Sequence, residues 1–417
     1  MKLSELKKKI QKYQYFENTD IIDVSLATII SNRLQLGKPV WMIIIGASSG
    51  GKSQIINPLS LTGASDDGEK PYIYRIDDLT ENTFLSGIRV KDGDPDPSLL
   101  FKIGKRGILS MSDITVLFSR NAESKNAILS QFRMIYDGEM TKATGNGVTK
   151  TWQGSLGVIA GSTPSVYGHF EEVADMGERF IYYRMKDYDA KKATHIALNR
   201  VLFGKELDEK LSMIYDEYIK EVVKSCVGVN FELSEATKDR ITDVAVLAER
   251  MRTTTKLDWK EEHIKKLPIV AFPMRVAIQL SVLAKGLMAM KYVECGEMEL
   301  GEKELHILDW CAYSLGNEEK RAVLDVLAKQ DFGHTIKNSD VANVVGLGNN
   351  VISNVLQELA SIGLVLRTTL NTGSDQAGSF LWSIKTVEDW NVLRRINEVK
   401  QSENIEPDIP DEDYYEE

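Results

Sequence analysis

The chain has 417 residues, of which 43% are hydrophobic and 27% are charged, as in ordinary soluble globular proteins. Its length predicts two or three domains, and its longest apolar run, residues 40–45, is far too short to span a membrane. The charged amino terminus does not resemble a signal peptide, and three widely spaced cysteines predict neither disulfides nor a zinc site, so we expect a cytoplasmic protein without membrane contact.

The net charge of −10 argues against a general nucleic-acid coat protein. Eight acidic residues and no basic residue lie within residues 403–417, and without them the net charge would be −2. We expect an acidic, disordered tail over residues 396–417. The rest of the chain is close to neutral and can still carry a local basic patch.

Residues 1–36 predict one or two helices, because apolar residues recur at helical spacing from Leu3 to Tyr13 and again over residues 21–36. We expect this extension to pack on the domain that follows it. Docking to a partner or a neighbouring subunit is the alternative.

A glycine-rich sequence follows the first strongly apolar segment. Residues 41–45 run directly into Gly46-x-x-x-x-Gly51-Lys52-Ser53. A strand, a glycine-rich turn and a helix in this order form a phosphate-binding loop, in which Lys52 reaches the β- and γ-phosphates and Ser53 offers a hydroxyl to Mg²⁺. We predict an NTPase that uses ATP and Mg²⁺, with a fortuitous turn as the alternative. The predicted loop is Gly46, Ala47, Ser48, Ser49, Gly50, Gly51, Lys52 and Ser53.

Four further apolar segments predict buried strands, at residues 71–76, 107–111, 155–160 and 178–184. Their alternation with helical or looped connections is typical of an α/β fold with a parallel sheet, which binds its ligand at the carboxyl ends of the strands. After residue 188 the pattern becomes helical, and residues 317–386 predict helices and two strands in the order of a winged helix.

Hydrolysis of ATP requires an acid that holds Mg²⁺, a group that orients water and cations at the γ-phosphate. Asp113 ends the third strand and is the predicted magnesium ligand, with a helix cap or a solvated carboxylate as the alternative. No glutamate follows it, so either another group orients water or hydrolysis is weak. Asp78 and Glu123 are equal candidates for that group.

Two further residues have candidate roles at the γ-phosphate. Thr163, at the end of the fourth strand, can reach the phosphate or water, the role called sensor 1. Arg179 is either a buried structural ion pair or an arginine finger inserted into a neighbour's site, and a finger would require a ring or filament of subunits.

The order of these motifs resembles that of AAA+ ATPases, and most of all the minichromosome-maintenance helicases and related phage or mobile-element ATPases. Those proteins also carry an arginine that opens a lid helix of the form Arg-x-x-x-x-Leu-x-x-Leu-Ala, and Arg275 matches it, which implies a sensor 2 role. The resemblance implies a homo-oligomer, which we expect to be a hexameric ring, and covers residues 37–385.

Several features depart from that family. The Walker B glutamate and the zinc-bearing amino-terminal domain are missing, Thr163 stands in place of Asn, and Glu178 stands in place of Ser. We predict a P-loop AAA+ α/β core with a helical lid and a winged-helix domain. The expected divisions are an N-terminal helical extension (1–36), the core (37–188), the lid (189–300), the winged helix (301–395) and the tail (396–417).

DNA contact has two candidate sites. The residues flanking Asn146-Gly147 alternate as in a hairpin, and in the resembling helicases such a hairpin grips DNA with a lysine, which Lys142 and Lys150 match. A surface hairpin with solvated lysines is the alternative. The predicted recognition helix, residues 350–362, has no Lys or Arg, so DNA and protein contact remain equal alternatives there.

The leading hypothesis is therefore an oligomeric DNA-dependent ATPase, a helicase or helicase-like initiator of a phage or mobile element. A protein-remodelling or regulatory ATPase, whose winged helix and acidic tail bind protein partners, is the second. A nucleotide-gated switch without useful turnover is the third.

Overall fold

The computed structural model describes residues 1–48, 50–62, 71–91, 94–145, 147–169, 179–186, 189–198, 204–254, 268–369 and 380–402. The tip of the predicted wing and residues 403–417 of the predicted acidic tail lie outside these residues. The expectation of a disordered tail was wrong for residues 396–402, which form the end of helix α16 (Val387–Ser402). The chain divides into two compact units. Unit 1 comprises residues 1–248 and 272–315, and unit 2 comprises residues 249–271 and 316–417.

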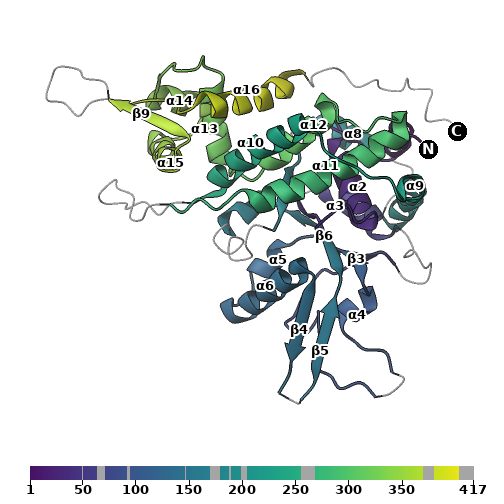
Figure 1. Ribbon diagram of the computed structural model, residues 1–417. Helices are drawn as coiled ribbons and strands as arrows, with labels where there is room; N and C mark the ends of the chain where they lie inside the picture. The colour runs from purple at the N-terminus through teal and green to yellow at the C-terminus, as the bar shows by residue number, and fades with distance from the viewer. Residues whose placement is uncertain are drawn as a thin grey trace. The chain divides into compact units, whose positions relative to one another are not determined.

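Unit 1 contains a five-stranded parallel sheet with the order β2-β3-β6-β1-β7 (Figure 1). Its central strands are apolar and almost wholly buried, as expected for a sheet covered on both faces. The prediction of an α/β fold with a parallel sheet is confirmed. The strands are β1 (Trp41–Ile45), β2 (Ile73–Arg75), β3 (Arg106–Met111), β6 (Ser155–Ser162) and β7 (Ile181–Arg184).

Helix α2 (Asp20–Arg33) is the central helix of unit 1. Every residue from Ile21 to Arg33 is buried, because the helix packs on strands of the sheet and on the long helix α11 (Met274–Cys295). The expected amino-terminal helices thus pack on the domain that follows them. The remaining helices of the sheet region are α1 (Leu3–Gln11), α3 (Lys52–Ser60), α4 (Leu99–Ile103), α5 (Thr115–Phe118), α6 (Ala122–Asp137) and the 3₁₀ helix η1 (Pro164–His169).

A glutamine joins the helical part of unit 1 to the sheet. The carboxamide of Gln279, on α11, accepts a hydrogen bond from the Trp41 amide at 2.9 Å and donates one to the Arg179 carbonyl. It thereby satisfies backbone groups at the amino ends of β1 and β7. The other helices after the sheet are α8 (Ala190–Leu198), α9 (Gly204–Cys226), α10 (Glu235–Arg252), which continues into unit 2, and α12 (Glu302–Tyr313).

Helix α11 is long and apolar enough to cross a membrane, and among the described helices it alone meets that length and composition. In this structure it packs against α2 and α12, and most of its apolar window is buried. That burial is typical of the core helix of a globular domain.

The predicted hairpin is present as the antiparallel strands β4 (Glu139–Ala143) and β5 (Thr149–Gln153), which extend away from the main sheet (Figure 1). Met140 and Trp152 are buried on its inner face, and the indole N–H of Trp152 donates to the Gly104 carbonyl at 2.7 Å. Thr141 and Thr151 lie on the exposed face. The hairpin is therefore braced on one side.

Unit 2 contains helices and a small antiparallel sheet of order β8-β10-β9. Its core includes Leu356, Leu359 and Trp382, and the buried ammonium of Lys320 contacts the Glu358 carboxylate at 3.0 Å and the Thr253 carbonyl at 2.5 Å. The elements are α13 (Glu318–Ala328), β8 (Ile336–Lys337), α14 (Asn338–Val345), α15 (Asn349–Ser361), β9 (Val365–Thr369), β10 (Phe380–Ile384) and α16 (Val387–Ser402).

Candidate nucleotide-binding site

The glycine-rich loop joins the carboxyl end of β1 to the first residue of α3. Gly51 has φ 88°, a left-handed conformation that glycine adopts without steric cost, and α3 starts at the next residue. The Gly46 amide donates to the Ser162 carbonyl at 3.1 Å, which fixes the start of the loop to β6. The loop is thus held at the edge of the sheet where the parallel strands end, although Ser49 lies outside the described residues.

Lys52 lies across this loop. Its ammonium donates to the carbonyls of Gly46 and Ala47, at 2.9 and 2.6 Å. Burial lowers the pKa of Lys52, and the nearby carboxylate of Asp113 opposes that lowering. Ser53 is exposed in the first turn of α3, as is Ser48 in the loop. A cation, a hydroxyl and a helix N-terminus therefore gather at one place, which is the arrangement that binds phosphate.

Asp113 follows β3 and lies two residues before the short helix α5, whose N-cap is Ile114. Its Oδ1 accepts hydrogen bonds from the amide and the hydroxyl of Thr115, at 2.9 and 2.6 Å. Its Oδ2 has no hydrogen bond within the part of the chain that the structure describes. The predicted alternative of a helix N-cap is not met, since that position is Ile114, and one oxygen of Asp113 is still available to a metal ion.

Of the two candidates for orienting water, Asp78 is already engaged in an ion pair, whereas Glu123 is exposed. Asp78 pairs with the Arg120 guanidinium, and that hydrogen bond lowers the pKa of Asp78. Glu123 is exposed in the first turn of α6. Beside Asp78, the Ser112 hydroxyl donates to Asp77 at 3.0 Å and accepts from Arg75 at 3.0 Å, a contact that the sequence did not reveal.

Thr163 directly follows β6, between the ends of β1 and β3 in the sheet order. Its hydroxyl lies 2.6 Å from the Ser165 hydroxyl. The sheet thus brings Lys52, Asp113 and Thr163 to the carboxyl edge of three neighbouring strands, as the sequence predicted for a parallel sheet.

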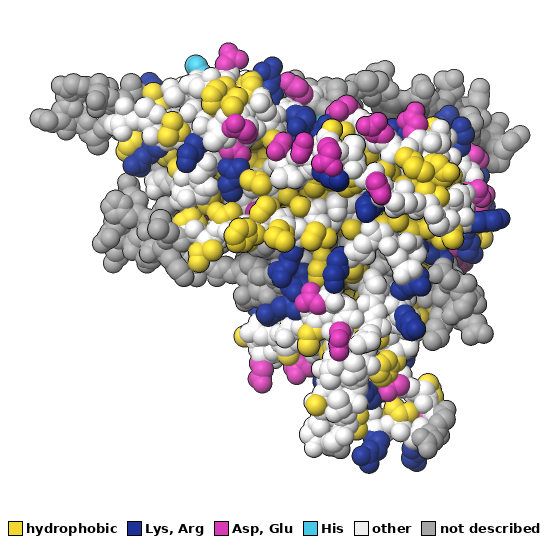
Figure 2. All heavy atoms as spheres, viewed as in Figure 1, with side chains coloured by type: hydrophobic (Ala, Val, Ile, Leu, Met, Phe, Trp, Pro, Cys, Tyr) yellow, Lys and Arg dark blue, Asp and Glu magenta, His cyan; other side chains and the backbone are white. Residues whose placement is uncertain are grey.

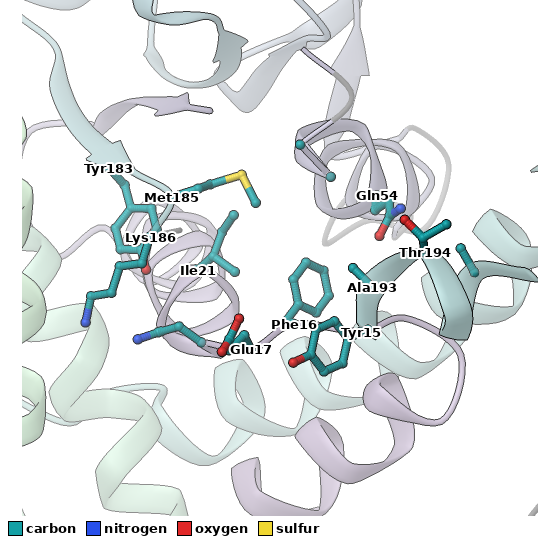
Figure 3. A pocket seen from close by; sticks show the side chains of 14 residues that line it. Tyr15, Phe16, Glu17, Ile21, Gln54, Tyr183, Met185, Lys186, Ala193 and Thr194 are labelled. Carbon is teal, nitrogen blue, oxygen red and sulfur yellow. The ribbon is translucent and has the colours of Figure 1, made fainter. Parts of the chain in front are cut away.

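A cavity of about 240 Å³ opens beside Gly50 and Gly51 (Figure 3). The aromatic rings of Tyr15 and Phe16, together with Ile21 and Met185, form its apolar wall. Polar side chains at its margin, among them Gln54 and Thr194, can donate and accept hydrogen bonds. A cavity that combines an apolar wall with polar groups at its margin can hold and orient a small molecule.

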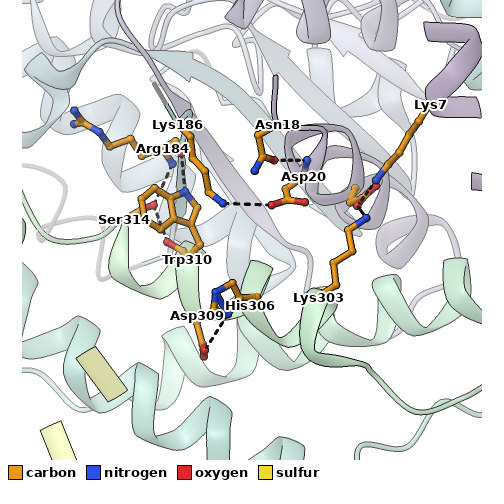
Figure 4. A network of polar contacts seen from close by, with 11 residues as sticks. Lys7, Asn18, Asp20, Arg184, Lys186, Lys303, His306, Asp309, Trp310 and Ser314 are labelled. Atoms are coloured by element: carbon orange, nitrogen blue, oxygen red, sulfur yellow. Dashed lines mark hydrogen bonds and ion pairs between the residues drawn. The ribbon is translucent and has the colours of Figure 1, made fainter. Parts of the chain in front are cut away.

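A polar network holds one wall of this cavity in place (Figure 4). The indole N–H of Trp310 donates to the Arg184 carbonyl at 2.7 Å, and the Arg184 amide donates to the Ser314 hydroxyl at 3.1 Å. The Lys186 ammonium lies 5.5 Å from the Trp310 ring centroid and 3.7 Å from the Asp20 carboxylate. These contacts connect the end of β7 to α12 and to the first turn of α2.

Arg179 and Arg275, the candidates for an arginine finger and for sensor 2, lie at the opposite edge of the sheet. Arg179 precedes β7 and is 4% exposed, and its guanidinium pairs with Asp137 at 3.0 Å and lies over the Tyr136 ring at 5.3 Å. Its pKa is lowered by burial, with Asp137 opposing and the nearby Arg275 adding to the effect. The ion pair with Asp137 is the structural role predicted as one alternative for Arg179, and a finger role would require the guanidinium to leave Asp137. Arg275 is exposed at the start of α11.

Neither arginine can reach the loop of its own chain. Ile181 pairs with Met42 in the sheet, so Arg179 lies level with Val40. At ~3.3 Å per residue, six residues of strand separate that level from Gly46 by about 20 Å. A catalytic role for either arginine would therefore require a second subunit.

The hairpin lysines are paired within the chain. The Lys142 ammonium donates to the Glu81 carbonyl at 2.5 Å and to the Asn82 side chain at 2.8 Å. Lys150, directly opposite in the hairpin, lies 2.8 Å from the Asp96 carboxylate. Both lysines thus lie on the inner face of the hairpin and are paired within the chain, whereas the alternative had supposed a surface hairpin with solvated lysines.

Apart from Gly50 and Gly51, sequence reasoning missed the residues of the cavity, which come from the amino-terminal segment, α3, the end of β7 and α8. Only the adjacent aromatic residues Tyr15 and Phe16, between two predicted helices, gave a local signal. No protein-family model and no curated protein matches this sequence, so the assignment of the site rests on its residues and their geometry.

Proposed function

We propose that the chain binds ATP with Mg²⁺ and hydrolyses it. The observation that carries the proposal is the convergence of the glycine-rich loop, Lys52, Asp113 and Thr163 at one edge of the parallel sheet, beside the cavity at Gly50 and Gly51. The base would occupy that cavity and the phosphates the loop.

The residues present fit a magnesium ion. The Ser53 hydroxyl and the Oδ2 of Asp113 are oxygen ligands of the kind that Mg²⁺ prefers. When bound, the ion would neutralise charge on the β- and γ-phosphates. Lys52 would exchange its two carbonyl contacts for phosphate oxygens, and Thr163 would position water or the γ-phosphate.

We assign this ATPase to the AAA+ class that its motifs resemble. Strand β6, which Thr163 directly follows, lies between the Walker A strand β1 and β3, the strand before Asp113, and this supports the sensor 1 role. The distance of Arg179 and Arg275 from their own loop supports sites shared between subunits. Figure 2 shows hydrophobic side chains gathered on the face over the region of α11. Exposed apolar side chains flank Arg275, as expected at a subunit interface, and they are Phe272, Met274 and Ile278.

Mixing two inactive variants tests the shared sites. Lys52→Ala subunits and Arg179→Ala subunits are each expected to hydrolyse ATP poorly, and an equimolar mixture is expected to recover about a quarter of the wild-type rate if pairing is random. Asp137→Asn, which removes the partner of Arg179 but keeps the guanidinium, is the matched control for a structural role. A mixture no faster than its components, with Arg179→Ala melting at lower temperature, would leave Arg179 as a structural residue only.

We propose DNA as the partner of this ATPase, on the strength of the family resemblance and of the winged-helix order of α13, α14, α15, β9 and β10. ATP hydrolysis is expected to rise severalfold on addition of single- or double-stranded DNA, and the rise is expected to weaken at higher salt because phosphate contacts release counterions. Steady-state phosphate release measures it. An oligomeric protein whose rate of ATP hydrolysis is unchanged by both kinds of DNA would contradict the assignment of DNA as the partner.

A protein-remodelling or regulatory ATPase is the second candidate, and unit 2 supplies the observation that favours it. Helices α14 and α15 contain no Lys or Arg, and Val344, Leu347 and Val351 are exposed around the turn between them. An apolar surface without cations suits a protein partner better than a phosphate backbone. This candidate predicts that Lys142→Ala leaves the rate unchanged and that a protein partner stimulates it.

A further inference from the structure

A second cavity, of about 730 Å³, lies at the other end of unit 1 from the glycine-rich loop. It is formed by the end of α2 and the following turn, the first residue of β3, the end of α9 with the loop after it, and α11. Since β3 runs from this cavity toward Asp113, the two cavities lie at opposite edges of the sheet.

Three cations line this cavity, and its lining contains no carboxylate. They are Arg33, Arg106 and Lys285. Arg106 and Lys285 form no ion pair within the described ranges, and Arg33 lies over the Tyr72 ring at 4.7 Å. Cations gathered without acids produce a positive potential that attracts an anionic ligand.

The rest of the lining is largely apolar. Val227 is 73% exposed at the margin, and Leu34, Leu36 and Val229 contribute further apolar surface. Inorganic phosphate would leave this surface in contact with water. The cavity therefore suits a ligand that combines negative charge with apolar side chains.

Gln35 lines the same cavity at the turn that ends α2, with φ 55°. The backbone amide of Gln35 donates to the Asn32 carbonyl at 3.2 Å, and that of Leu36 donates to the Ser31 carbonyl at 3.0 Å. This hydrogen-bond pattern is that of a helix end at which glycine is the usual residue. A side chain in this left-handed conformation is strained, whereas glycine would not be. The carboxamide retained there can donate a hydrogen bond to a carboxylate.

We propose that this cavity binds an acidic peptide segment with interleaved apolar residues, and that residues 403–417 of this chain are such a segment. Their eight carboxylates complement the three cations, and Ile405, Ile409, Tyr414 and Tyr415 complement the apolar lining. Fifteen residues reach about 50 Å when extended, far enough to cross the cavity. Single-stranded nucleic acid fits less well, because the aromatic residue in the lining, Phe231, is 1% exposed and gives bases no stacking surface.

Fluorescence anisotropy with a labelled peptide of residues 403–417 tests this proposal, and it needs no ATP hydrolysis. The receptor is the full-length chain in which the eight acidic residues of its own tail are replaced by their amides, so that the tail does not compete. Saturable binding is expected, and Arg106→Glu or Lys285→Glu is expected to weaken it about tenfold. Lys205→Glu, on an 85% exposed side chain of α9, is the charge-matched control and should bind as the parent does.

Gln35→Gly separates a binding role from a structural one. It is expected to weaken peptide binding severalfold while the melting temperature stays equal or rises, because glycine relieves the strain. A polyglutamate peptide of equal charge should bind more weakly than residues 403–417. The proposal would be overturned if the peptide showed no saturable binding, or if both charge reversals left its binding unchanged. It would also be overturned if a 15-nucleotide single strand bound at the cations while the peptide did not.

Discussion

Replacing Lys52 with alanine is expected to lower ATP hydrolysis by two to three orders of magnitude, on the order of the loss seen when a preorganised charge at a transition state is removed. The ammonium is held over the loop by the carbonyls of Gly46 and Ala47 and faces the Asp113 carboxylate. No other side chain of the loop carries a positive charge. Steady-state phosphate release measures the effect of the substitution on turnover, and nucleotide titration measures its effect on nucleotide affinity.

The fold of this variant is expected to stay intact, because Lys52 forms its two hydrogen bonds only with loop carbonyls that water can also reach. Lys105→Ala is the matched control, since that exposed lysine lies at the opposite edge of the sheet. A Lys52→Ala protein that hydrolyses ATP at the parental rate would show that the loop is not the hydrolytic site.

Local patterns were sufficient for the elements that carry the loop. A buried parallel strand is apolar along its whole length, and residues 41–45 are recognisable for that reason. The hairpin was equally predictable, because Asn-Gly favours the tight turn between β4 and β5. The order of the strands was not, because it depends on how helices pack between them rather than on any one segment.

Helix α2 illustrates what periodicity cannot reveal. Its sequence predicts a helix, but nearly every residue is buried, so it has no polar face that would indicate its surroundings. Its central position between the sheet and α11 follows only from tertiary packing. Helix α12 was not predicted at all, although it holds the end of β7 through Trp310 and Ser314.

The candidate site shows the same division. The sequence placed Lys52, Asp113 and Thr163 at one sheet edge, because that follows from parallel strands alone. It could not place Tyr15 and Phe16 beside Met185, which are distant in the chain. The sequence predicted the hairpin that carries Lys142 and Lys150, but only the structure shows that these lysines contact Glu81, Asn82 and Asp96.

Replacing Gly161 with alanine is expected to damage the site without altering any predicted catalytic side chain. A Cβ atom at this position would lie 2.3 Å from the Ser112 carbonyl oxygen and 3.1 Å from Ile56. Since the nearest atom belongs to the backbone, β3 and β6 would have to separate there. The Ile114 amide, which donates to the Gly161 carbonyl at 2.9 Å, would move with Asp113 beside it.

The expected cost is about 1–3 kcal/mol in the free energy of unfolding, the usual range for overpacking a core. Hydrolysis is expected to fall about 100-fold, because a displacement of about 1 Å in a positioned group has that effect, whereas nucleotide affinity should fall less since the loop itself is untouched. Chemical denaturation and phosphate release measure the two effects. Gly145→Ala, where no atom lies within 4 Å of the added Cβ, is the control. A Gly161→Ala protein with parental stability and rate would contradict the close approach of β6 to Ser112, and with it the way the sheet positions Asp113.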